Sequence, residues 1–375
     1  MGDESRKNIY TTMESLAGKV YKISEECMNR FPYYRDERSG KLFCTDACNW
    51  SGGHWVSLQL NAYIISPVSG IINNIKALAG KISCRSRDRD IFLGFIFYYS
   101  FARMYDMFGS EGDLNTALLA ADNLISMYNP YAGLIPLGSE CQVLGTDIQG
   151  NNLAAVDGSI IGNILLYWAY DHTGKDYYLK TAVSNLDSTV KIFMRNDYSV
   201  IHMVEFNPDT GNILAKWNNL GYSNNTTWSR GQAWFLLALA YGYKYAGKKE
   251  YIDFYRKALR FYISHCRLPD LVPLYDFQAP EEPETPADAS SLAIMAKSYL
   301  IMLDLGMDDD GTLDSIINAI LAIIDVTPSK FITHHVCFDY PHRFATDSDM
   351  IFADYYILDF LIHLNEYLRR GNKII

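Results

Sequence analysis

Apolar residues recur along most of the chain at steps of three and four positions, the spacing that collects side chains on one face of an α-helix. The pattern predicts helices over residues 10–30, 55–63, 71–78, 91–107, 114–127, 158–171, 177–193, 230–245, 251–266, 289–305, 313–324 and 352–368. Alternation typical of a β-strand appears over residues 199–206, which precede the turn sequence NPDTGN. The chain is therefore predicted to be mostly helical.

Twelve predicted helices make six helical hairpins, and repeated hairpins can close into a ring. The apolar segment 91–101 is typical of an inner helix that protein surrounds on every side. We therefore expect an all-α protein with the (α/α)6 toroid fold. An open superhelical repeat is the alternative, but its repeats should resemble one another more closely than these segments do. No Pro- or Ser-rich linker divides the chain, so we predict one domain over residues 1–375.

The composition narrows the possible partners. Among 375 residues, 49% are hydrophobic and 20% are charged, as in a globular protein with a large core. The net charge of −10, without a dense basic cluster, argues against nucleic acid as a partner. The longest apolar run is about half of what a membrane-spanning helix needs, so we expect no membrane partner. The pattern carries no signal for an oligomeric state.

The seven cysteines are odd in number and scattered, and the chain starts with the polar sequence MGDESRKN. These features predict reduced thiols and a cytoplasmic location. Cys44 with Cys48, and His334 with His335, lack further ligands at the spacing of a zinc site. Nucleotide-binding and common hydrolase motifs are missing too, so we expect no metal and no cofactor.

Polar and aromatic residues gather where predicted helices begin. The segment from Trp50 to Trp55 has a tryptophan on each side of two glycines, which would let a ligand approach the backbone. The chain contains 28 Tyr and six Trp, and aromatic rings of this kind suit sugar ligands, although core packing explains most of them.

Asp157 is a lone carboxylate directly before a long apolar helix. One interpretation is an N-cap, a position that Asp favours. The other is a carboxylic acid in an apolar cleft, with a pKa raised by desolvation so that it donates a proton near neutral pH. Farther along, Arg230, Gln232 and Trp234 start another helix, and this combination is typical of a carboxylate clamp with stacking walls.

The motifs together resemble the unsaturated glucuronyl hydrolases, glycoside hydrolase family 88, and the related unsaturated rhamnogalacturonyl hydrolases of family 105. The resemblance rests on residues 50–55, Leu-Gly-Phe at 93–95, the run around Asp157, His202 followed by NPDTG, WSRGQAW at 228–234, VPLYDF at 272–277, DASSLAI at 288–294 and ADYY at 353–356. Their order matches from about residue 45 to 365, so residues 1–44 precede the matched part.

The resemblance implies removal of a 4,5-unsaturated uronic acid from oligosaccharides. An aspartic acid would protonate C4 of the vinyl ether and water would add at C5. The hemiketal would then open and expel the remaining sugar. Asp157 matches the acid, His202 a histidine close to the reaction, and Arg230, Gln232 and Trp234 the substrate contacts, with Trp50 as a stacking wall. The partner implied is a small anionic sugar or a related small molecule.

Two departures from the family pattern stand out. In the family, a His-Asp pair precedes a Gly-Phe pair, and the positions that align with this His and Asp are Ile91 and Phe92. Asp90 could act as the second acid only if a bulge in the helix shifts it into that place. The family often has a Gln-Gly pair before the Trp-Arg segment, and this chain has Leu220-Gly221 at that place. Besides the usual hydrolase, two alternatives therefore stay open: a repurposed member acting on another vinyl ether or enol in biosynthesis, and a carbohydrate-binding pseudoenzyme. The presence of Asp157 argues against the latter.

Overall fold

The structure is a computed structural model, and it describes residues 3–36, 38–141, 143, 146–266, 271–324 and 331–371. The α-helices of these residues are α1 (Asp3–Cys27), α2 (Gly52–Ile65), α3 (Ile71–Ser83), α4 (Leu93–Phe97), α5 (Arg103–Phe108), α6 (Glu111–Met127), α7 (Gly158–Ile161), α8 (Asn163–Thr173), α9 (Asp176–Phe193), α10 (Ser229–Ala246), α11 (Lys249–Ser264), α12 (Ala289–Asp304), α13 (Thr312–Ile323) and α14 (Ile351–Gly371). Each predicted helical range overlaps at least one of these helices. The range 91–107 divides into α4, a π-helical turn η2 (Tyr98–Ala102) and α5, and the range 158–171 into α7 and α8.

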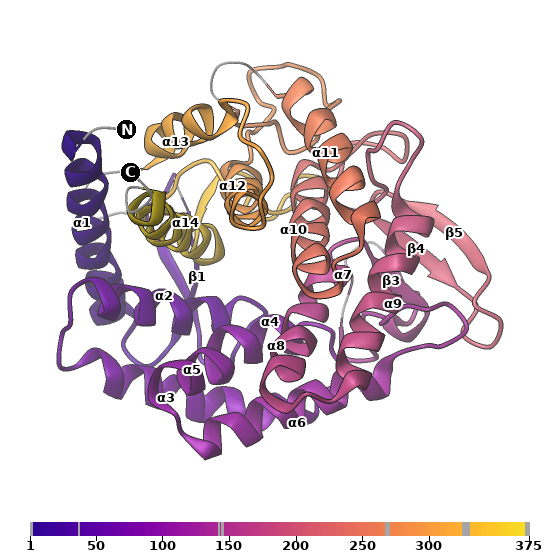
Figure 1. Cartoon of the computed structure of the whole chain (residues 1–375), viewed down its shortest axis with the longest axis horizontal. Helices are drawn as coiled ribbons and strands as arrows, with labels where there is room; N and C mark the ends of the chain where they lie inside the picture. The colour runs from indigo at the N-terminus through magenta and orange to yellow at the C-terminus, as the bar shows by residue number, and fades with distance from the viewer. Residues whose placement is uncertain are drawn as a thin grey trace.

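The helices form two concentric rings (Figure 1). In the inner ring α2, α4, α8, α10, α12 and α14 each pack against the next, and α14 packs against α2. Outside them α1 and α3 lie against α2, α6 against α4, α9 against α8, α11 against α10, and α13 against α12. The predicted (α/α)6 toroid is confirmed. The open superhelix is wrong, because the contact between α14 and α2 closes the ring.

Burial explains why the two rings have different sequences. Every residue from 227 to 240, in and before inner helix α10, is buried. Outer helix α11 instead buries one face, with Tyr251, Tyr255, Ala258 and Tyr262 among its buried residues. The three- and four-residue periodicity is therefore clear in the outer helices, whereas inner helices such as α2 and α10 are buried on all sides over most of their length.

Two glycines permit close helix contacts in the inner ring. A Cβ atom on Gly94 of α4 would lie 1.7 Å from the carbonyl oxygen of Ile161 in α7. A Cβ atom on Gly53 of α2 would lie 2.5 Å from the carbonyl oxygen of Ile96. The expectation that Gly53 admits a ligand to the backbone is therefore wrong, because the space beside it is filled by α4.

Two small antiparallel sheets lie beside the helices. One has the order β2-β1-β6, formed by β1 (Phe31–Asp36), β2 (Leu42–Thr45) and β6 (Ser348–Met350). The other has the order β3-β4-β5, formed by β3 (Leu153–Ala155), β4 (Met203–Phe206) and β5 (Ile213–Trp217). The strand predicted at 199–206 is confirmed as β4. The remaining strands were not predicted, because runs of three to six residues are too short for a clear alternating pattern.

The prediction of seven reduced thiols is wrong for Cys27 and Cys44, which form a disulfide. Cys27 ends α1 and Cys44 lies in β2, and the pairing of β1 with β2 brings their Cα atoms to 6.5 Å. The other five cysteines are free. Among the helices of the described residues, none combines the length and the apolar character that crossing a membrane requires.

Candidate active site

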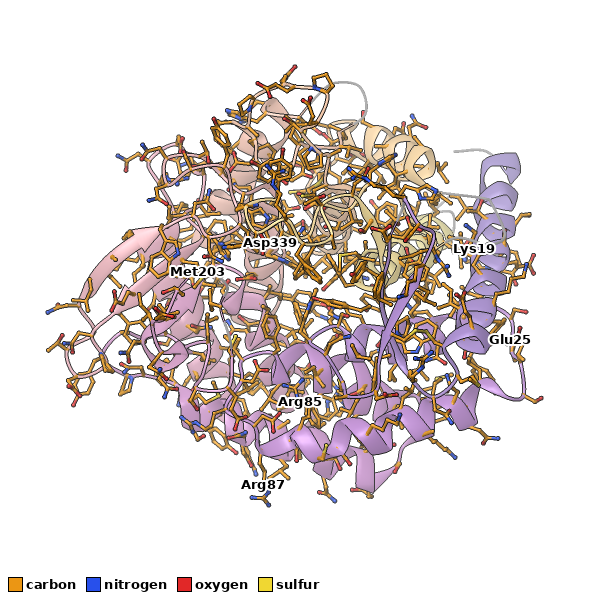
Figure 2. All side chains as sticks on the ribbon, turned by 180° about the vertical axis from the view of Figure 1, so that it is seen from behind. Lys19, Glu25, Arg85, Arg87, Met203 and Asp339 are labelled. Carbon is orange, nitrogen blue, oxygen red and sulfur yellow. A yellow bond between two sulfur atoms is a disulfide. The ribbon has the colours of Figure 1, made fainter. Side chains whose placement is uncertain are left out.

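A cavity of about 430 Å³ opens where several inner helices begin. It is lined by Tyr33, Trp50, Phe92, Phe95, Leu137, Cys141, Val143, Ala155, Asp157, Ile161, His202, Met203, Asn219, Leu220, Trp228, Arg230, Trp234, Phe338, Asp339 and Phe344. Figure 2 labels Met203 and Asp339, which come from β4 and from the loop before β6. A second hollow, of about 720 Å³ between α9 and α11, contains none of the predicted site residues.

Five predicted site residues meet in this cavity, although they come from distant parts of the chain: Trp50, Asp157, His202, Arg230 and Trp234. Trp50 stands before α2 and its ring centroid lies 5.7 Å from that of Phe92. Trp234, one turn into α10, packs against Phe95 with ring centroids 5.3 Å apart. The two tryptophans therefore contact rings that lie three positions apart, just before and within α4.

Asp157 is held at the cavity by the short sheet. Strand β3 ends two residues earlier and pairs with β4 so that Ala155 lies opposite Met203. No side-chain hydrogen bond from Asp157 caps α7, and its Oδ1 atom has no hydrogen-bond partner among the described residues. Asp157 therefore stands at the N-cap position of α7 but does not cap the helix through its side chain. Burial raises the pKa of Asp157 to about 6, against the lowering effect of the Arg230 charge.

His202 is placed beside Asp157 by the same pairing, since the Val156 amide donates to the His202 carbonyl oxygen at 2.9 Å. Its ring lies against Trp228, with centroids 4.5 Å apart. The Leu220 amide donates to Nδ1 at 3.2 Å, so the proton of the neutral ring is on Nε2. Burial and the nearby Arg230 charge lower the pKa of His202 to about 3. His202 is thus a neutral hydrogen-bond donor at neutral pH.

Arg230 is 2% exposed and forms a buried ion pair with Asp288. Its Nη1 atom also donates to the carbonyl oxygen of Cys337 at 2.7 Å, and Nη2 donates to that of Phe338. These bonds use both protons of Nη1 and one of Nη2, which leaves one Nη2 proton and the Nε proton for a ligand. The remaining donors are adjacent, as a side-on contact with a carboxylate requires.

The chain is similar in sequence to unsaturated glucuronyl hydrolases and unsaturated chondroitin disaccharide hydrolases. An unsaturated glucuronyl hydrolase of Formosa agariphila is 31% identical over 207 residues, which are 52% of this chain and 51% of the relative, so the chain is matched to about half of that relative's length. An unsaturated chondroitin disaccharide hydrolase of Streptococcus pyogenes serotype M1 is 25% identical over 334 residues, or 84% of this chain and 81% of the relative. No protein-family model matches the chain.

A solved structure is similar to this chain over almost its whole fold. A variant of the unsaturated glucuronyl hydrolase of Streptococcus agalactiae, complexed with dGlcA-GalNAc6S, superposes with a TM-score of 0.79 at 20% identity, covering 96% of this chain and 92% of the other. The chain is thus similar in sequence and in fold to unsaturated glucuronyl hydrolases. Relatives in this family bind unsaturated oligosaccharides, as that complex illustrates.

Two predicted site residues do not line the cavity. Asp90 forms an ion pair with Arg85 at 2.7 Å, and its other carboxylate oxygen accepts from the Phe92 amide at 2.9 Å. Figure 2 shows Arg85 well away from Met203 and Asp339. The π-helical turn η2 lies farther along the helix and does not bring Asp90 inward. Phe92 lines the cavity instead, so the expected role of Asp90 as a second acid is contradicted.

Gln232 is also turned away from the cavity. Its side-chain nitrogen donates to the carbonyl oxygens of Tyr198 and Ala258, at 3.0 and 3.2 Å. Ala258 belongs to outer helix α11, so Gln232 joins the two rings of the toroid. This placement contradicts the expected substrate contact, because the amide is directed outward from the inner ring.

Sequence reasoning missed Asp339, which is 2% exposed and lines the cavity. Its carboxylate accepts from the backbone amide of His342 at 3.0 Å and from His342 Nδ1 at 2.9 Å. Phe338 and Phe344 flank it and line the cavity too. The sequence FDYPHRF at 338–344 held a signal, since it combines rings with a carboxylate and a histidine three positions apart.

Proposed function

We propose that this protein removes a 4,5-unsaturated uronic acid from a glycoside by hydrating the vinyl ether of the sugar ring. The single observation that carries the proposal is Asp157, an enclosed carboxyl group in the cavity with one unpartnered oxygen and a pKa raised to about 6. Such a group keeps its proton to a higher pH than an ordinary carboxyl group and has a free oxygen with which to deliver it.

The chemistry needs one carboxyl group acting twice. Asp157 donates its proton to C4, and the positive charge that develops is shared by C5 and the ring oxygen. Water then adds at C5 and gives a proton to the Asp157 carboxylate, which restores the acid. The resulting hemiketal opens to a ketone, and the hemiacetal at C1 releases the leaving group as an alcohol. One water molecule is consumed in all.

The other residues of the cavity have supporting roles in this proposal. The free Nε and Nη2 protons of Arg230 would hold the uronate carboxylate, with the positive charge of Arg230 directed at it. The neutral His202 would donate from Nε2 to an oxygen of the sugar or of the attacking water. Because Asp90 is paired with Arg85, no step uses a second carboxylate from α4 or its approach.

One observation favours a second candidate function, the hydration of a different vinyl ether or enol. Phe92 occupies the cavity where the family resemblance implies a carboxylate, so the site has lost a polar contact to the usual sugar. In this candidate Asp157 keeps its role as proton donor, and the substrate differs in the ring that it presents to Phe92.

Unsaturated disaccharides produced by polysaccharide lyases test the proposal. We expect loss of the ultraviolet absorbance of the conjugated enol acid and, in water enriched in oxygen-18 with immediate borohydride trapping, the label at C5 of the product. Direct hydrolysis at C1 would place the label at C1 instead and would refute the hydration chemistry. Absence of turnover on every uronide, with turnover of another vinyl ether, would select the second candidate.

A further inference from the structure

Five aromatic residues form a continuous surface on one side of the cavity, which we call the aromatic wall: Tyr33, Trp50, Phe92, Phe338 and Phe344. The ring centroid of Trp50 lies 5.7 Å from that of Phe92 and 5.9 Å from that of Phe338, nearly parallel to the latter. Tyr33 lies 6.0 Å from both Phe338 and Phe344. A flat group of a ligand can therefore contact several rings at once.

The aromatic wall offers few polar groups to a ligand. The indole nitrogen of Trp50 donates to the Tyr33 hydroxyl at 3.0 Å, so the indole donor is used and the Tyr33 O–H is the one side-chain donor of the wall that a ligand could use. The remaining members are phenylalanines. Asp90, the carboxylate two positions before Phe92, is held outside the cavity by Arg85. A sugar ring seated here would lose hydrogen bonds to water from its hydroxyl groups and regain few from the protein.

Charge at the wall also disfavours an anionic group. Asp339 follows Phe338 directly and lines the same cavity. The described lining residues contain one Arg and no Lys, and that residue, Arg230, is paired with Asp288 through Nη1. His202, the lining histidine, is neutral because its pKa is lowered. A sulfate beside the wall would therefore face the Asp339 carboxylate, and the described lining has no cation to hold it besides Arg230, whose free donors the uronate carboxylate would occupy.

Arg230 separates the aromatic wall from the reacting end of the cavity. Its guanidinium lies 4.7 Å from the ring of Trp228, which packs on His202, and 5.4 Å from the ring of Phe338. A ligand whose carboxylate is held by Arg230 and whose C4 lies at Asp157 has its other end directed to the wall. That end is the leaving group.

We propose that the aromatic wall binds the leaving group, and that this group is a flat, uncharged aromatic or apolar aglycone rather than a sulfated sugar. The assignment of this part of the ligand as a leaving group rests on the proposed function, whereas the preference for a flat uncharged group rests on the wall itself. The preference makes Phe92 and Phe344 specificity-determining residues.

Binding and turnover should be measured with two ligands that share the unsaturated uronic acid. One is its 4-nitrophenyl glycoside, and the other is dGlcA-GalNAc6S. Binding is measured by calorimetry on Asp157→Asn, which keeps the cavity without consuming the ligand. We expect the aryl glycoside to bind at least about tenfold more tightly, as contact with several rings would provide.

Variants of the wall separate its role from general stability. Phe344→Ala should weaken binding of the aryl glycoside about tenfold and leave dGlcA-GalNAc6S nearly unchanged. Phe92→Asp should also weaken the aryl glycoside. The matched control is Phe43→Ala, because Phe43 stacks on Tyr34 beside the wall but does not line the cavity, and it should change neither affinity.

The outcomes distinguish the two proposals. Equal or tighter binding of dGlcA-GalNAc6S, equal weakening of both ligands by Phe344→Ala, or binding of neither ligand would overturn the inference. Selective binding of the aryl glycoside supports it whether or not the native protein turns the ligand over. If that selective binding occurs without turnover of either ligand, the proposed function is rejected and the aromatic-aglycone site stands.

Discussion

Replacing Asp157 with asparagine should stabilise the protein while it removes activity. The carboxyl group has a pKa of about 6 in the fold and 3.8 when exposed, so the folded state binds its proton more tightly than the unfolded state. The stabilisation from that proton is complete below pH 3.8 and is lost as the pH rises through about 6. Above pH 6 the fold carries an enclosed, ionised carboxylate, and asparagine avoids that cost.

The pKa shift gives the size of the effect. A rise from 3.8 to about 6 corresponds to ~3 kcal/mol at 1.36 kcal/mol per pKa unit, and this is an upper bound because the asparagine amide is also poorly hydrated. With an unfolding entropy of ~2.1 cal/mol/K per residue over 375 residues, the melting temperature should rise by at most ~4 °C at pH 8. Turnover should fall by ~10²–10⁴, the usual contribution of general acid–base catalysis.

Thermal unfolding of both proteins at several pH values checks this prediction. The melting temperature of Asp157→Asn should exceed that of the native protein at pH 8, and the difference should shrink towards zero near pH 4. Native turnover should decline as the pH rises above about 6, because the proton donor is then lost. A difference in melting temperature that is the same at pH 8 and pH 4, or an Asp157→Asn protein with full activity, would refute the reasoning.

Three further predictions follow from the contacts. Asp90→Asn should lower the melting temperature at pH 8, because it breaks the 2.7 Å ion pair with Arg85. Turnover should stay within about twofold of native, and a large loss of turnover would show that Asp90 takes part in the reaction. Arg230→Lys should raise the apparent substrate constant more than it lowers turnover. It should also destabilise the fold, since lysine cannot replace the guanidinium contacts to Asp288 and two carbonyl oxygens. Unchanged affinity for an anionic ligand would exclude the carboxylate contact. Thiol titration of the unfolded, unreduced protein should detect five thiols. Reduction of the Cys27–Cys44 disulfide should raise the count to seven and cost ~3 kcal/mol of stability. Seven thiols before reduction would show that the bond does not form.

The helices and their closure into a toroid could be predicted from the sequence. Helical periodicity is local, because residues three and four apart share a face whatever the rest of the chain does. Outer helix α11 shows this with Tyr251, Tyr255 and Tyr262 on its buried face. Inner helix α10 carries the complementary signal, an apolar run without a polar face. Short strands such as β3 escaped prediction, because three residues with partners distant in sequence leave no periodic pattern.

The cavity was predicted in part. Asp157, His202 and Arg230 stand out in sequence because polar residues next to long apolar helices are rare and need a reason. These three residues lie in one cavity because β3 pairs with β4 and because α10 begins beside that pair. The order of the motifs indicates this shared location, but the residues alone do not prove it.

Only the tertiary structure decided which neighbouring side chains face the ligand. Asp90 and Phe92 are two positions apart at the start of one helix, and the Arg85 guanidinium draws the carboxylate out of the cavity while the ring lines it. Gln232 is directed to α11 although it lies two positions from Arg230. The direction of a side chain at a helix start depends on the partner that reaches it, and that partner is supplied by another element of the fold.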